Sequence, residues 1–137
     1  MNIEEFKEIM ISYGSKIEIN FTEEQINKFY KYMNLLLEWN EKINLTAITK
    51  QDEIILKHFV DCLTIQKYIV KNKKIVDIGT GAGFPGIPLA IMNESNNFVL
   101  VDSLNKRINF LNDVKEKIKV KNLVNIESIR KTSEEVL

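Results

Sequence analysis

The stretch VDIGTGAGFPGIPLA, residues 76–90, decides the fold of this chain, because it holds four of the five glycines and both prolines of the sequence. A short apolar run, residues 73–78, leads into the glycines, and IPLAIM, residues 87–92, follows them. A strand, a glycine-rich turn and a helix start in this order let a ligand approach backbone atoms and direct N–H groups toward it. A plain tight turn needs only one or two glycines, so the stretch predicts a ligand-binding loop.

The pattern after the loop indicates a parallel sheet. Residues 97–102, NFVLVD, form a second apolar strand, and residues 123–129 form a third. Between them, residues 103–118 have a helical period, with Leu104, Ile108, Leu111, Val114 and Ile118 on one face. Strands that alternate with helices build parallel sheets through right-handed crossovers. The predicted fold class is therefore α/β, with a Rossmann-like parallel sheet.

The first half of the chain has a helical pattern. A short helix is predicted over residues 3–13, ended by Gly14. Thr22 and Gln25 have the spacing of a capping box, which predicts a helix over residues 22–40. The side chains expected on its apolar face are Ile26, Phe29, Tyr30, Met33, Leu36 and Leu37.

A polar loop and one further helix complete this half. Residues 44–49, NLTAIT, interrupt the helical period, and residues 51–69 resume it with Ile55, Phe59, Cys62, Leu63 and Ile69. The sequence therefore predicts two parts: an N-terminal helical extension, residues 1–70, and a partial Rossmann-like domain, residues 71–137.

Two classes of ligand compete for the glycine loop. Residues 81–86, GAGFPG, match the G-x-G-x-x-G pattern of nicotinamide and flavin dinucleotide sites. Gly79 lies nearer the strand, however, and from it the third glycine of that pattern would be residue 84, which is Phe. Read from Asp77, the pattern is D-x-G-x-G-x-G, which is typical of S-adenosylmethionine-dependent methyltransferases. This frame favours S-adenosylmethionine, with Asp77 ordering the loop or contacting the ammonium group.

Asp102 ends the second predicted strand, 23 residues after Gly79. A carboxylate there can accept hydrogen bonds from both ribose hydroxyls. The same acid serves either cofactor, so it supports nucleoside binding without choosing between them. The alternatives are that Asp102 caps the next helix or is solvated, and Ser103 is a second candidate for that cap.

The two halves of the chain carry opposite net charges. Residues 1–70 carry 8 Lys and Arg against 11 Asp and Glu, and residues 71–137 carry 11 against 8. The basic side chains of the second half are candidates for RNA binding, although a solvated helix face is the plainer interpretation; the candidates are Lys106, Arg107, Lys115, Lys117, Lys119 and Lys121.

The cysteine count and hydropathy predict a cytoplasmic location. Cys62 is the only cysteine, so no disulfide can form within the chain. No apolar run approaches the roughly 20 residues that span a bilayer, and the first ten residues lack the apolar core of a signal peptide. We expect neither a membrane partner nor a metal ion, and the sequence leaves the oligomeric state open.

Four segments in order resemble the bacterial small-subunit ribosomal RNA guanine-N7 methyltransferase family, also called methyltransferase G or glucose-inhibited division protein B. They are LLLEWNEKINLTAI (35–48), KHFVDCL (57–63), VDIGTGAGFPGIPLAI (76–91) and LVDSLNKRINFL (100–111). The Phe-Pro-Gly-Ile-Pro extension of the loop is more specific than its glycines. The resemblance covers about residues 22 to 135.

The resemblance implies a class I methyltransferase fold and methyl transfer from S-adenosylmethionine to a guanine N7 in small-subunit ribosomal RNA. Guanine N7 carries a lone pair and no proton, so no catalytic base is needed, and His58 and Asn44 are candidates for positioning substrate. For His58, on a partly apolar helix, a structural role such as capping a helix is the plainer interpretation. Thr46 borders the cofactor mouth by resemblance. The residues expected to contact the cofactor are Asp77, Gly79, Thr80, Gly81, Ala82, Gly83, Phe84, Asp102, Ser103 and Glu134.

The sequence departs from the family pattern in three places. Cys62 stands where the family commonly has Ser. Lys131 and Thr132 replace a Gly-Arg pair in a segment that helps to hold adenine in the family, while Glu134 keeps its acid. The chain stops at Leu137 after three predicted strands, so we expect only the front half of the fold, with the first strand at an exposed edge and no catalysis by this chain alone. Two alternatives stay open: a dinucleotide (NAD or FAD)-binding oxidoreductase fragment and a non-catalytic RNA-binding module.

Overall fold

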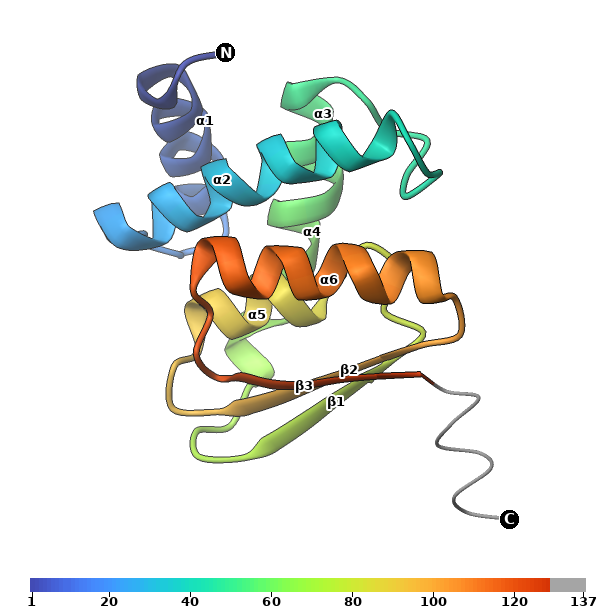
Figure 1. Cartoon of the computed structure of the whole chain (residues 1–137). Coiled ribbons are helices and arrows are strands. Elements are labelled where there is room, and N and C mark those ends of the chain that lie inside the picture. Colours follow the sequence, from blue (N-terminus) through green and yellow to red (C-terminus); the bar gives the residue numbers. More distant parts are fainter. Residues whose placement is uncertain (129–137) are drawn as a thin grey trace.

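A computed structural model describes residues 1–128 of the chain. Figure 1 shows a layer of helices that lies on one face of a small sheet. In chain order the elements are α1 (Ile3–Lys16), α2 (Glu23–Asn40), α3 (Gln51–Ile54), the π-helix η1 (Ile55–Val60), α4 (Asp61–Leu63), the 3-10 helix η2 (Gln66–Tyr68), β1 (Lys74–Ile78), α5 (Gly86–Met92), β2 (Asn97–Asp102), α6 (Asn105–Ile118) and β3 (Leu123–Ser128).

Helix α1 is longer than predicted. The Asn2 side chain caps its start by accepting a hydrogen bond from the Glu5 N–H. Gly14 was expected to end the helix, which is wrong, because the helix continues to Lys16. Gly14 serves packing instead: a Cβ added there would lie 2.6 Å from the Phe21 ring. A glycine is therefore required for close contact within the helix and not for a turn after it.

Helix α2 begins as the sequence predicts. The Thr22 hydroxyl accepts from the Gln25 N–H, and the Gln25 side chain accepts from the Thr22 N–H, so the capping box is confirmed. The apolar face was only partly predicted: Tyr32 and Leu35 are buried, whereas Tyr30 is only half-buried. The face is turned toward Tyr32 because α2 packs against α6 and α5 in addition to α1.

The predicted single helix over residues 51–69 is interrupted. Its middle is the π-helix η1, followed by the short helices α4 and η2. Buried side chains come in neighbouring pairs five residues apart, first Ile54 with Ile55 and then Phe59 with Val60. That spacing matches the i→i+5 ladder of a π-turn, which keeps both pairs against the core. The 3.6-residue period used for the prediction missed this register.

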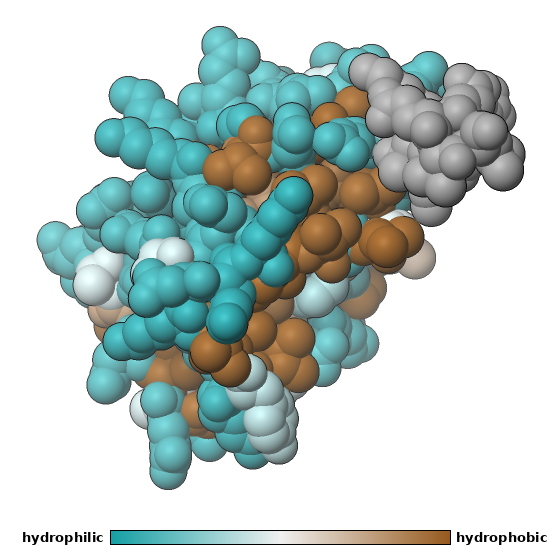
Figure 2. Space-filling model, turned by 90° about the horizontal axis from the view of Figure 1, so that it is seen from below, coloured by the Kyte–Doolittle hydropathy of each residue, from teal (hydrophilic) through white to brown (hydrophobic). Residues whose placement is uncertain are grey.

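The three strands form a parallel sheet in the order β1-β2-β3, as predicted, with α5 and α6 as the crossovers. Helices α5 and α6 cover one face, and α2 lies across them on the side away from the sheet (Figure 1). The strand β1 forms one edge. On the opposite face the side chains of Val76, Ile78 and Val124 are exposed, and Figure 2 shows apolar side chains gathered in a band across it.

One hydrophobic cluster runs through the described residues. It joins Phe6 and Met10 of α1 to Phe110 of α6 and Leu123 of β3. The two parts predicted from the sequence therefore share a core, and their division near residue 70 stays a prediction. Among residues 1–128 no helix is long and apolar enough to cross a membrane.

Candidate functional site

The four glycines of the loop have two different roles. Gly79, Gly81 and Gly83 have positive φ angles of 74°, 61° and 96°. A Cβ added at Gly79 or Gly81 would meet nothing within 4 Å, whereas one at Gly83 or Gly86 would collide with a neighbouring side chain. Gly83 and Gly86 are therefore required for packing. The space beside Gly79 and Gly81 is open, so a ligand could approach their Cα atoms closely, while their N–H groups donate to the Val101 carbonyl and to Asp102. Ligand binding by this loop stays a prediction.

Asp77 holds the glycine loop through two hydrogen bonds. One oxygen of its carboxylate, Oδ2, accepts hydrogen bonds from the Thr80 hydroxyl at 2.6 Å and from the Gly86 N–H at 3.0 Å. Burial raises the pKa of this carboxyl, and the two hydrogen bonds oppose that rise. Thr80 itself is buried. The contacts give Asp77 the loop-ordering role predicted for it, at the start of α5, where N–H groups lack helical partners.

Asp102 is the most buried charged side chain of the site, with only 2% of its surface exposed. Its Oδ2 accepts from the Gly81 N–H at 2.8 Å, and its Oδ1 accepts from the Leu104 N–H at 3.1 Å. The Arg107 guanidinium lies 3.4 Å from the same Oδ1. Asp102 thus ties the glycine loop to the start of α6.

The start of α6 differs from the prediction. The helix begins at Asn105, its N-cap is Leu104 and no side chain caps it in the usual way. The alternative that Ser103 caps this helix is therefore wrong, and Asp102 accepts instead from the N–H of Leu104, the residue before the helix. Leu104 was expected in the core but is half exposed, because it precedes the first helical turn. Ser103 and Lys106 are exposed beside the loop.

A buried tyrosine connects the N-terminal helices to the glycine loop. The Tyr32 hydroxyl on α2 donates to the carbonyl of Ala82. Its ring stacks on Phe59 with 5.3 Å between centroids and contacts Phe84 at 5.8 Å. Sequence reasoning missed Tyr32, although its position three residues after Phe29 on an apolar helix was a usable signal.

His58 lies beside the loop rather than in the core. Its ring stacks on Phe84 with 4.3 Å between centroids and 13° between planes. Its Nε2 is 2.8 Å from the Thr46 hydroxyl oxygen. Burial lowers the pKa of His58, and Asp61 opposes that shift. The pair Phe84–His58 therefore joins the glycine loop to the loop of residues 44–49, a stack that sequence patterns did not indicate.

The 44–49 loop is itself held by α2. The Asn40 side chain accepts from the N–H groups of Leu45 and Thr46 at 2.9 and 3.0 Å. Thr46 accepts in turn from the Ile48 N–H. Asn44 is exposed, and no hydrogen bond joins it to the other residues within 1–128. The structure thus brings Thr46 to the site through His58 but gives Asn44 no contact there.

The basic candidates do not form one patch. Lys106 and Arg107 lie at the start of α6, near the glycine loop, whereas Lys117, Lys119 and Lys121 lie at and beyond its other end. Lys115 is near this second group, with its Nζ 3.5 Å from the Val124 carbonyl oxygen. The positions Lys131, Thr132 and Glu134 lie outside the described residues, so the cofactor contact expected of Glu134 stays a prediction.

The family model and the curated relatives that match this chain carry the same family name. The family model for rRNA small subunit methyltransferase G, GidB, matches residues 25–135. The ribosomal RNA small subunit methyltransferase G of Clostridium botulinum (strain Eklund 17B) is 52% identical over 125 residues, which are 90% of this chain and 52% of that relative. The proteins of the same name from Clostridium tetani and Clostridium perfringens (strain SM101) are 48% and 49% identical, over 88% and 90% of this chain and 52% and 53% of theirs. The chain spans about half the length of these curated relatives.

Proposed function

The chain belongs to the rRNA small subunit methyltransferase G family, and from this premise we propose that it carries the cofactor site of an enzyme that transfers a methyl group from S-adenosylmethionine to N7 of a guanine in small-subunit ribosomal RNA. The observation that carries the proposal is the open space beside Gly79 and Gly81, in a loop that the half-buried Asp77 and the buried Asp102 hold by hydrogen bonds. Family membership also argues against the dinucleotide oxidoreductase alternative.

The loop suits a ligand with no phosphate group. S-adenosylmethionine, when bound, supplies a methyl group on a positively charged sulfur. The residues that would hold it are Gly79 and Gly81, through close contact with their Cα atoms, because their N–H groups already donate to Val101 and Asp102. Asp77 and Asp102 hold the loop in place around it. Each carboxylate oxygen has two acceptor sites. Oδ2 of Asp102 accepts a hydrogen bond from the Gly81 N–H, so its second lone pair can accept one from a ribose hydroxyl.

Methylation of guanine N7 requires the protein to position the substrate but not to remove a proton from it. Guanine N7 has no proton to remove, so the chain need not provide a base, and burial lowers the pKa of His58, which favours its neutral form. The stacked rings of Phe84 and His58 lie beside the loop, and the contact of His58 Nε2 with the Thr46 hydroxyl fixes the orientation of the imidazole. Alignment of reacting groups of this kind contributes about 7–11 kcal/mol in favourable cases. Positioning is therefore the role that we propose for His58.

The first test is calorimetric titration of the chain with S-adenosylmethionine, with NAD as the parallel ligand. We expect saturable binding of S-adenosylmethionine and none of NAD. Gly81→Ala adds a methyl group into open space at a positive φ, which costs folding about 1–3 kcal/mol and blocks the approach of the ligand. Binding of NAD alone, or unchanged affinity in a folded Gly81→Ala variant, would refute the proposed site.

The role of Asp102 needs its own variant. Asp102→Ala removes both the acceptor for Gly81 and the proposed ribose contact, so we expect weaker binding of S-adenosylmethionine. Asp52→Ala is the matched control, because Asp52 is an exposed acid on α3. Circular dichroism separates loss of fold from loss of binding. Equal affinities in the two variants would contradict the role given to Asp102.

A further inference from the structure

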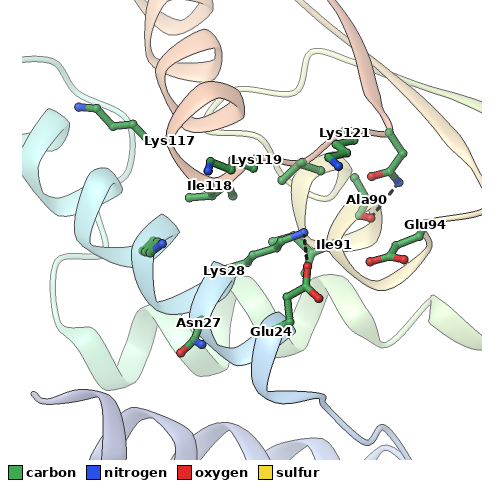
Figure 3. A pocket seen from close by; sticks show the side chains of 13 residues that line it. Glu24, Asn27, Lys28, Ala90, Ile91, Glu94, Lys117, Ile118, Lys119 and Lys121 are labelled. Atoms are coloured by element: carbon green, nitrogen blue, oxygen red, sulfur yellow. Dashed lines mark hydrogen bonds and ion pairs between the residues drawn. The ribbon is translucent and has the colours of Figure 1, made fainter.

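A cavity of about 720 Å³ lies at the end of the molecule away from the glycine loop. Residues from α2, from the ends of α5 and α6 and from the connection to β3 line it (Figure 3). Its polar lining is dominated by lysines: Lys28, Lys31, Lys117, Lys119 and Lys121. Sequence reasoning singled out the last three but missed the two on α2, because residues about 90 positions apart in the chain meet only through the packing of α2 on α6.

The lining has an excess of positive charge. Two acids, Glu24 and Glu94, line the cavity with the five lysines, and Asp113, outside the lining, offsets a third lysine, which leaves two positive charges unbalanced. Lys28 pairs with Glu24 at 3.3 Å, and Lys117 pairs with Asp113 at 3.2 Å. The three remaining lysines, at positions 31, 119 and 121, make no ion pair with any residue within 1–128. Their ammonium groups are therefore available to an anionic partner.

Lys119 occupies a backbone position that a lysine does not favour. It ends α6 in the left-handed conformation, with φ 55° and ψ 53°. Glycine or asparagine is the usual residue at such a helix end, because a side chain with a Cβ is strained there. The backbone at Lys119 therefore carries a cost that a glycine at this position would remove.

The floor of the cavity is rigid. The Asn122 side chain donates to the carbonyls of Ala90, Asn93 and Asn96 at 2.9 to 3.0 Å. Asn96 is fully buried and bonds in turn to Val70 and Lys73. The neighbouring Lys121 therefore extends from an ordered backbone, which lowers the cost of placing its charge.

The chemistry of the lining favours a polyanion over a small anion. The ends of α5 and α6 present carbonyl groups here, and a compact anion such as free phosphate binds best to backbone N–H groups at helix starts. Lysines spread over three elements can each meet a separate phosphate of an extended backbone. Ion pairing of this kind carries no base specificity, so it positions a nucleic acid rather than reads it.

We propose that the cavity lined by these five lysines is a second RNA-binding surface, which binds backbone phosphates of the substrate remote from the glycine loop. Helix α6 has 14 residues and spans about 21 Å, so the glycine loop and the cavity would hold RNA at points roughly that far apart. The inference rests on the proposed function, because it assumes that RNA is the substrate.

The test compares two double variants of the whole chain in binding a fluorescein-labelled RNA hairpin at several salt concentrations. Lys119→Gln with Lys121→Gln removes two charges from the cavity. Lys16→Gln with Lys67→Gln removes the same charge from exposed positions on α1 and η2. We expect about tenfold weaker binding for the first variant only. The slope of log K against log salt should also fall by about 0.7–0.9 for each phosphate that the variant no longer neutralises.

A third variant separates charge from stability. Lys119→Gly relieves the left-handed backbone, so we expect equal or higher thermal stability together with weaker RNA binding. Equal loss of affinity in both double variants, or no loss in either, would overturn the inference. So would saturable binding of inorganic phosphate in a parallel calorimetric titration, because that result would identify a small-anion site.

The same samples distinguish this inference from the proposed function. Each variant is also titrated with S-adenosylmethionine, and we expect wild-type affinity for it in all of them. If the variants bind S-adenosylmethionine normally and the cavity substitutions leave RNA binding unchanged, this inference is refuted and the proposed function is not. A wild-type chain that binds neither S-adenosylmethionine nor RNA refutes both.

Discussion

Replacing Tyr32 by Phe tests whether the N-terminal helices hold the glycine loop. The change removes one hydroxyl and keeps the ring, so the stacking on Phe59 is preserved. The hydroxyl donates to the Ala82 carbonyl, and both residues are buried. Within residues 1–128, the Ala82 carbonyl accepts no other hydrogen bond. The variant therefore leaves a buried acceptor without a partner.

The magnitude follows from that unsatisfied carbonyl. A buried acceptor left without its donor costs about 1–3 kcal/mol, and the added apolar character of Phe offsets part of it. We expect a loss of about 1–2 kcal/mol in the free energy of unfolding. With a urea m-value of about 2 kcal/mol per molar, the midpoint of unfolding falls by about 0.5–1 M.

The assay is equilibrium unfolding in urea, followed by the fluorescence of Trp39, the single tryptophan. Its indole N–H donates to Asp113 at 2.8 Å, so its signal reports the contact of α2 with α6. Tyr30→Phe is the matched control, because the Tyr30 hydroxyl donates to the carbonyl of Met1 and is only half-buried. We expect its midpoint to stay within experimental error.

The Tyr32→Phe substitution should affect the glycine loop in addition to the stability of the fold. Ala82 lies between Gly81 and Gly83, so a loosened carbonyl at Ala82 lets the proposed cofactor loop move. We expect weaker binding of S-adenosylmethionine in Tyr32→Phe and unchanged binding in Tyr30→Phe. Equal unfolding midpoints for Tyr32→Phe and the wild type would refute the reasoning, since the hydroxyl would then contribute nothing to the fold.

Three further predictions follow from single contacts. In Gly86→Ala the added Cβ would collide with Leu100 Cδ2, so we expect a loss of about 1–3 kcal/mol in urea unfolding; an unchanged midpoint would show that the strand and helix separate easily. Burial raises the pKa of Cys62 to about 12, so a disulfide reagent at mildly alkaline pH should label it only after urea is added, and rapid labelling of the folded chain would contradict its burial. Burial lowers the pKa of His58, so the unfolded chain takes up more protons as the pH falls below about 6.5. The folded state should therefore lose stability toward acid, less so in His58→Gln, and identical pH profiles for the two proteins would count against a lowered pKa at the half-buried His58.

Local patterns were sufficient for the order of elements. The capping box at Thr22, the apolar strand at residues 97–102 and the glycine loop are each specified by neighbours in the chain, and the structure agrees with all three. The assignment to the methyltransferase G family also depends only on sequence, because its motifs are contiguous segments. The positive φ angles at Gly79, Gly81 and Gly83 fall on the residue that adopts them without strain, whereas nothing in the sequence indicated those at Glu18 and Lys119.

Contacts between distant segments were decided by the tertiary structure alone. The π-turn at residues 55–60 exists because two pairs of side chains must face one core, and a helical period cannot express that requirement. Gly14 looked like a helix end, but it makes room for Phe21. The position of Asp102 at a strand end predicted a carboxylate that contacts a ligand. Its hydrogen bonds to the glycine loop and to the start of α6 could not be predicted, because these partners lie in two separate parts of the chain.

The sequence by itself determined the strand, the glycine loop and the family, because each is written in residues that are neighbours along the chain. Only the tertiary structure decided which helix steadies that loop and which lysines share a cavity. Tyr32 reaches Ala82 across 50 positions of the chain, and Lys28 meets Lys119 only where α2 crosses α6. Such pairings depend on how apolar faces pack, and the packing energy belongs to the whole core rather than to any one segment.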